Sequence, residues 1–159
     1  MSDSAQNLIE QLGLAAHPEG GWYRETWRGA ACAAGQGDAG APGRAEGTAI
    51  IFLLKADEAS HWHRVDATEL WLWQAGDPVE LRLAASDAGP VRSVVLGADV
   101  GAGQRLQGLV APHEWQAARP HGTPVHGYSL VSCVVVPGFD FAGFTLAPPG
   151  WEPGEEPIR

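Results

Sequence analysis

The sequence has few basic residues and few cysteines, and each shortage excludes a class of partner or fold. Ten Lys and Arg residues stand against 19 Asp and Glu residues, so the net charge is −9, and Lys55 is the one lysine. A protein that follows a nucleic-acid backbone or binds an anionic membrane needs a basic surface, which this composition does not supply. The two cysteines, Cys32 and Cys133, make no disulfide framework. We expect Cys133 to be a small buried residue.

Long apolar runs are also missing. The stretch Leu130–Val136 is far shorter than the ~20 residues that a membrane helix requires. The first residues, MSDSAQNL, have neither the basic nor the apolar region of a secretory signal. We therefore expect a cytoplasmic protein without a membrane segment. A chain of 159 residues suits one domain.

The residues that are present predict a mostly β protein. Helical periodicity is confined to about residues 6–14, with Ser4 as a possible N-cap and Gly13 as a possible C′ residue. Short apolar or alternating runs separated by Gly and Pro turns predict strands at 22–27, 48–54, 69–73, 79–85, 91–96, 104–111, 115–118, 128–136 and 139–146. This spacing is typical of an antiparallel sandwich or barrel. We expect a flexible Gly/Ala loop at 29–47, a barrel over 48–146, and a Pro-rich tail at 147–159 with no core of its own.

The stretch 60–76, SHWHRVDATELWLWQAG, carries the strongest chemical signal. His61 and His63 are two residues apart, and side chains at that spacing on a strand share a face. The same alternation places Glu69, Trp71 and Trp73 on one face of the next strand. Imidazoles and a carboxylate would then converge between tryptophans, as in a small-molecule site.

This spacing resembles the first motif of the cupin superfamily, H-x-H, a short gap, E, six residues and G, which ends here at Gly76. Four segments look like one small cupin subfamily whose members are regarded as sugar epimerases. They are HPEGGWYRETW (17–27), HRxxxxExW (63–71) followed by AGDP (75–78), WQAAR (115–119) and PGFDF (137–141). The resemblance implies an all-β cupin fold, the double-stranded β-helix or jelly-roll barrel, with one short N-terminal helix. It also implies a pocket inside the barrel and a homodimer, to which Trp22 and Trp27 would contribute.

The first functional hypothesis is acid–base catalysis by an isomerase or epimerase without a cofactor. Resemblance to the dTDP-sugar epimerases makes His63 the candidate base, with Glu69 or Asp66 orienting it and Tyr128 as the acid on a facing strand. Arg64 would bind an anionic group of the substrate, and Glu19 of the PEGG motif would reach the rim of the pocket. A histidine is the usual base for proton transfer near neutral pH.

The second hypothesis is a metal-dependent cupin enzyme resembling a dioxygenase. His61, His63 and Glu69 supply a two-histidine, one-carboxylate set suited to Fe, Mn, Ni or Zn. The second cupin motif normally ends in a histidine ligand, and the matching position here is Gln116, a weak amide ligand. The resemblance therefore implies an incomplete metal site.

The third hypothesis is a binding protein without chemistry. Trp71, Trp73, Trp115 and Tyr128 would line an apolar pocket in which His63, Glu69 and Gln116 fix the ligand by hydrogen bonds. The remaining histidines are expected outside the site. We expect His17 to be a turn residue and His121 and His126 to be exposed in a Gly/Pro loop.

Overall fold

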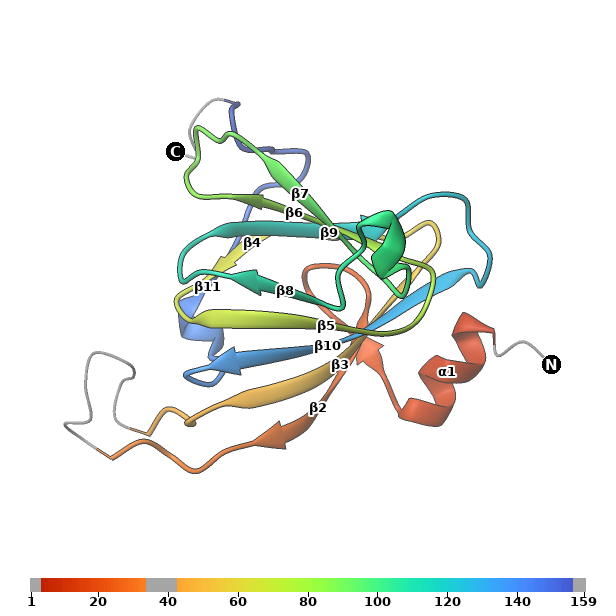
Figure 1. Ribbon diagram of the computed structural model, residues 1–159. Helices are drawn as coiled ribbons and strands as arrows, with labels where there is room; N and C mark the ends of the chain where they lie inside the picture. The colour runs from red at the N-terminus through yellow and green to blue at the C-terminus, as the bar shows by residue number, and fades with distance from the viewer. Residues whose placement is uncertain (1–3, 34–42, 156–159) are drawn as a thin grey trace.

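Two antiparallel β-sheets face each other in the computed structural model, which describes residues 4–33 and 43–155 (Figure 1). The six-stranded sheet has the order β1 (Ala15–Ala16), β2 (Trp22–Arg28), β3 (Thr48–Lys55), β10 (Tyr128–Val136), β5 (Thr68–Gly76) and β8 (Gln107–Val110). The five-stranded sheet has the order β11 (Phe144–Leu146), β4 (Ser60–Val65), β9 (Trp115–Pro120), β6 (Val79–Ala84) and β7 (Arg92–Leu96). The two sheets confirm the predicted all-β jelly roll.

The main core lies between the sheets. The buried side chains that meet there include Phe52 from β3, Trp71 from β5, Leu81 from β6 and Val131 from β10. Alternate residues of these strands face inward, as the period of two in the sequence predicts. Burial of these apolar side chains supplies the main favourable term in folding.

Helix α1 (Ala5–Leu12) packs on the outer face of the six-stranded sheet. Its Ile9 and the following Leu14 bury the outward-facing Leu53 of β3. The predicted caps are confirmed, since Ser4 Oγ accepts a hydrogen bond from the Asn7 N–H and Gly13 has a positive φ of 63°. A helix of this length needs such tertiary contacts to be stable. Among the described residues, no helix is long and apolar enough to cross a membrane.

The C-terminal segment is more closely packed than the sequence predicts. Trp151 lies against Trp115, with ring centroids 4.8 Å apart, and Trp62 joins them on the outer face of the five-stranded sheet. Residues 147–155 therefore cover a second apolar cluster, and the expectation of a tail without a core is wrong for them. Prolines prevent a strand here without preventing burial of a tryptophan.

Two predicted strands are shorter than expected. Phe139–Leu146 begins with the 3-10 turn η2 (Phe141–Gly143), because the Asp140 side chain accepts a hydrogen bond from the Ala142 N–H. The strand predicted at 104–111 shrinks to β8, and a second 3-10 turn, η1 (Val100–Ala102), precedes it.

The predicted 29–47 loop lies partly outside the described residues. Near its end Arg44 forms a two-pronged ion pair with Asp66, at 2.9 and 2.7 Å. The homodimer stays a prediction. Trp27, which is 50% exposed on β2 near the sheet edge, is the residue expected to contribute to it.

Candidate functional site

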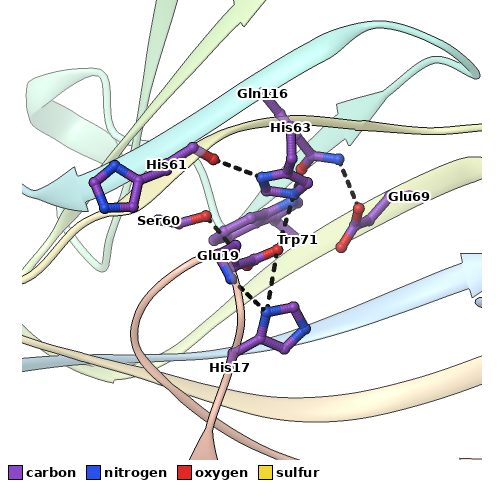
Figure 2. A network of polar contacts seen from close by, with 8 residues as sticks. All are labelled: His17, Glu19, Ser60, His61, His63, Glu69, Trp71 and Gln116. Carbon is purple, nitrogen blue, oxygen red and sulfur yellow. Dashed lines mark hydrogen bonds and ion pairs between the residues drawn. The ribbon is translucent and has the colours of Figure 1, made fainter. Parts of the chain in front are cut away.

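A β-bulge in β4 decides which histidine enters the barrel. Ser60 pairs with Ala118 and His63 with Gln116, so three steps along β4 match two steps along β9. The extra residue reverses the alternation of faces. Ser60 and His63 therefore point inward, whereas His61 is exposed, so the expectation that both histidines share a face is wrong (Figure 2).

The turn that follows β1 carries Glu19 into the same interior. Gly20 and Gly21 both have positive φ values, of 103° and 75°, which a tight turn needs and glycine adopts without strain. The Glu19 carbonyl accepts a hydrogen bond from the His61 N–H at 2.7 Å, which fastens the turn to β4. The HPEGG motif thus places a buried carboxyl group, 6% exposed, beside His63.

Hydrogen bonds fix the protonation of the Glu19–His63 pair. His63 Nδ1 contacts the His61 carbonyl oxygen at 2.7 Å and, because that oxygen can only accept, Nδ1 carries a proton. His63 Nε2 lies 3.1 Å from Glu19 Oε2. A carboxylate oxygen and an imidazole lone pair repel each other unless a proton lies between them. One proton is therefore shared in this contact.

Burial decides where that proton resides. Burial raises the pKa of Glu19 to about 8, against the hydrogen bond that Ser60 Oγ donates to Glu19 Oε1 at 3.1 Å. Burial also lowers the pKa of His63. Both shifts favour the neutral pair, in which the carboxyl group of Glu19 donates to the neutral ring of His63.

His17 is the functional residue that sequence reasoning missed. It lies at the predicted turn, but its side chain is only 5% exposed and lines the cavity. Its Nδ1 accepts a hydrogen bond from the Glu19 N–H at 3.1 Å and lies 3.5 Å from Glu19 Oε2. Burial, together with His63, lowers the pKa of His17 to about 4, so its ring is neutral. Its place in the HPEGG motif was the signal available in the sequence.

Glu69 enters from β5 as the second buried carboxyl group. Its Oε2 accepts a hydrogen bond from Gln116 Nε2 at 2.7 Å, and Gln116 Oε1 accepts one from Trp71 Nε1 at 2.8 Å. Burial raises the pKa of Glu69 to about 7, although the field of His63 opposes the shift. The thiol of Cys133, buried as predicted, also hydrogen-bonds Glu69. This chain of bonds holds Glu69 in one orientation.

These groups surround one cavity of about 650 Å³, within the range typical of small-molecule sites. His17, Glu19, His63 and Glu69 line it, together with apolar side chains that include Tyr23. Its lining also includes Arg24, Glu25, Arg28, Asp140 and Phe141. The cavity therefore combines apolar walls with a cluster of two carboxyl groups and two imidazoles.

Several predicted site residues lie elsewhere. Tyr128 packs in the cluster under α1, and the Trp73 indole donates to the Asp77 carbonyl at 3.3 Å. Arg64 stacks over Trp115, 4.7 Å from the ring centroid, on the outer face of the five-stranded sheet. The residues of the set that do not line the cavity are Arg64, Trp71, Trp73, Trp115, Gln116 and Tyr128, of which Trp71 and Gln116 act through Glu69. Asp66, proposed as an orienting group, pairs with Arg44 instead.

The donor set that the metal hypothesis requires is not assembled. The exposed His61 contributes its backbone carbonyl rather than its ring, and the side-chain oxygen of Gln116 already accepts from Trp71. In the part of the chain that the structure describes, no group of three or more His, Cys, Asp or Glu residues has a metal-binding arrangement. The set His61, His63, Glu69 and Gln116 therefore does not fit a bound Fe, Mn, Ni or Zn ion.

Comparison with known proteins agrees with this architecture. Residues 6–147 match the family model described as Cupin superfamily (DUF985). The chain belongs to this cupin family. Protein SO0799 from Shewanella oneidensis is 35% identical over 91% of this chain and 84% of its own, with a TM-score of 0.78. A hypothetical protein from Leishmania major is 34% identical over 89% and 86%, with a TM-score of 0.75. Oxalate decarboxylase from B. subtilis, at 9% identity over 83% of this chain and 29% of its own, with a TM-score of 0.55, shares the fold alone.

The buried proton of this cupin predicts a stability that falls as pH rises. Unfolded glutamate ionises near 4.5, whereas folded Glu19 retains its proton to about pH 8. Between these values the folded state binds more protons, so the free energy of unfolding decreases by up to ~1.4 kcal/mol per pH unit. Glu69 adds to this decrease up to about pH 7. The lowered pKa values of His17 and His63 act in the opposite sense, but only below the unfolded value of 6.5.

We therefore expect urea unfolding of the wild-type protein to show this decrease between about pH 6.5 and 8. The Glu19→Gln variant keeps a donor to His63 but cannot ionise, so its stability should change much less over this interval. An equal slope in the two proteins would show that Glu19 does not hold the proton.

Proposed function

We propose that this cupin is an isomerase or epimerase that removes and returns a proton on a carbon beside a carbonyl group of a small, carbohydrate-like metabolite. One observation supports this most directly: Glu69, with a pKa near 7, and the proton-sharing Glu19–His63 pair line the same cavity. A group whose pKa matches the working pH is the most effective general acid or base. Two such groups in one cavity allow removal of a proton by one and its return by the other.

The contacts favour a division of roles that differs from the sequence-based one. Both ring nitrogens of His63 are engaged, one by the His61 carbonyl and one by Glu19. Gln116 occupies only Oε2 of Glu69. We therefore assign Glu69 as the base that meets the substrate, and the Glu19–His63 pair as the proton donor. In this assignment Tyr128, which does not line the cavity, has no role in proton transfer.

Proton exchange tests the proposal before the natural substrate is known. The protein is incubated in D₂O with a panel of aldoses, ketoses and keto-sugar nucleotides, and NMR follows the loss of each proton next to a carbonyl group. We expect exchange with at least one class of compound, and its persistence after treatment with a chelator. Exchange that needs an added divalent metal would support the metal-dependent alternative instead.

The non-catalytic alternative gives a different result in the same samples. A ligand present at 100 times its Kd stabilises the fold by about 2.7 kcal/mol. Stabilisation by a sugar that undergoes no exchange, at any pH between about 6 and 9, would therefore favour a binding protein. Either result would contradict the proposed chemistry.

A further inference from the structure

Two arginines line the cavity, and they differ in their partners. Arg28 forms a two-pronged ion pair with Glu25, with both N–O distances 2.8 Å. Arg24, on the same strand, has no hydrogen bond or ion pair from its side chain to any of the described residues. A guanidinium group carries five donors in a planar fork that suits carboxylate and phosphate groups. The donors of Arg24 are thus available to a ligand.

An unpaired arginine is uncommon in this protein. Carboxylate partners at 4 Å or less neutralise the other described arginines except one: Arg28, Arg44, Arg64, Arg82, Arg92 and Arg119. The exception is Arg105, which lines a separate, shallower depression beside His121. A chain with a net charge of −9 has acidic residues in excess, so the free fork of Arg24 does not follow from a shortage of carboxylates.

The position of Arg24 also allows a purely structural role. A Cβ atom added to Gly13 would lie 3.7 Å from Arg24 Nη1, so the guanidinium group lies close to the C-terminal end of α1. A cation there is favourable because the C-terminal end of a helix carries partial negative charge. However, no hydrogen bond joins the Arg24 side chain to a carbonyl of α1 among the described residues, so its donors remain open.

We propose that Arg24 binds the anionic end, a carboxylate or a phosphate, of the small metabolite that occupies this cavity. The inference rests on the proposed function for the opposite, reacting end of the molecule. An anionic group is kept away from the buried carboxyl groups of Glu19 and Glu69, so charge orients the ligand with its carbonyl end at Glu69. The substrate class is then a sugar acid or a sugar phosphate rather than a neutral sugar.

Titration with probes that differ only in charge tests this inference. Glucose, glucuronate and inorganic phosphate are added at constant ionic strength, while NMR follows the Arg24 Nε–H signal, which is assigned by its loss in Arg24→Gln. We expect saturable shifts with glucuronate or phosphate, and none with glucose. Binding of glucuronate alone identifies a carboxylate ligand, and binding of phosphate alone identifies a phosphate ligand. Arg24→Gln should weaken binding roughly 10- to 100-fold, the loss of a charge-assisted contact.

The matched control is Arg105→Gln, which removes the other unpaired arginine and should leave the Kd of each probe unchanged. The inference is overturned if neither anion gives a saturable shift, or if both variants weaken binding equally. It is also overturned if Arg24→Gln lowers only the melting temperature, since Arg24 would then serve α1 alone. Binding of the anion does not require Glu69 to ionise. Anion binding without proton exchange would therefore refute the proposed function and leave this inference intact.

Discussion

Replacing Glu69 with Gln is expected to lower the rate of proton exchange by roughly 10²- to 10⁴-fold, the usual contribution of a general base. Gln is similar in size and retains an oxygen that can accept the Gln116 amide, now at 2.7 Å from Glu69 Oε2. The fold should therefore persist, which the unfolding midpoint in urea will check. The wild-type rate should rise with pH through about 7, as Glu69 loses its proton.

The matched control for this experiment is Glu46→Gln. Glu46 is exposed and does not line the cavity, so this variant removes the same charge without changing the site. Its exchange rate should equal that of the wild type. If Glu69→Gln retained full exchange while Glu19→Gln lost it, the base would belong to the Glu19–His63 pair instead.

Replacing Gly20 with Ala is expected to disrupt the site through the backbone. Gly20 has a φ of 103°, and its added Cβ would overlap the carbonyl oxygen of Ala59. The turn must then move away from β4, which weakens the hydrogen bond from the His61 N–H to the Glu19 carbonyl and separates Glu19 from His63. We expect a loss of stability of about 1–3 kcal/mol, the usual range for a strained backbone position.

Gly103→Ala separates the two causes of this loss. Gly103 has a similar φ of 89°, but no atom lies within 4 Å of its added Cβ. This control should show only the conformational cost of a positive φ, about 1 kcal/mol. Gly20→Ala should also lose the decrease in stability between about pH 6.5 and 8, because Glu19 is no longer buried beside His63. Equal losses of stability in the two variants, with that decrease retained, would show that Gly20 does not hold Glu19 in place.

The sequence alone determined most of the fold. Alternation of polar and apolar residues located β3, β6 and β10 to within one residue, because one face of each strand must be buried. The caps Ser4 and Gly13 located α1 because their side-chain and backbone preferences are local. Local rules failed where packing decides, as in residues 147–155, where burial of Trp151 outweighs a proline-rich composition.

Within the site, the sequence pointed to Glu19, His63 and Glu69, which line one cavity. The HPEGG and HRxxxxExW motifs carried that information. Only the tertiary structure decided the rest. A bulge in β4 turned His61 outward, and the pairing of β4 with β9 brought Gln116 opposite His63. Bulges and burial depend on contacts between strands that are distant in the sequence, so periodicity within one strand cannot predict them.

The same reason applies to the protonation of the site. The sequence supplies carboxyl groups whose pKa values in water lie near 4.5, and burial in the barrel raises those of Glu19 and Glu69 to about 8 and 7. The shift arises because low-dielectric surroundings disfavour the charged form. The sequence thus determined which ionisable groups this cupin has and which strands carry them. The tertiary structure decided which of them meet, and therefore which of them hold a proton at neutral pH.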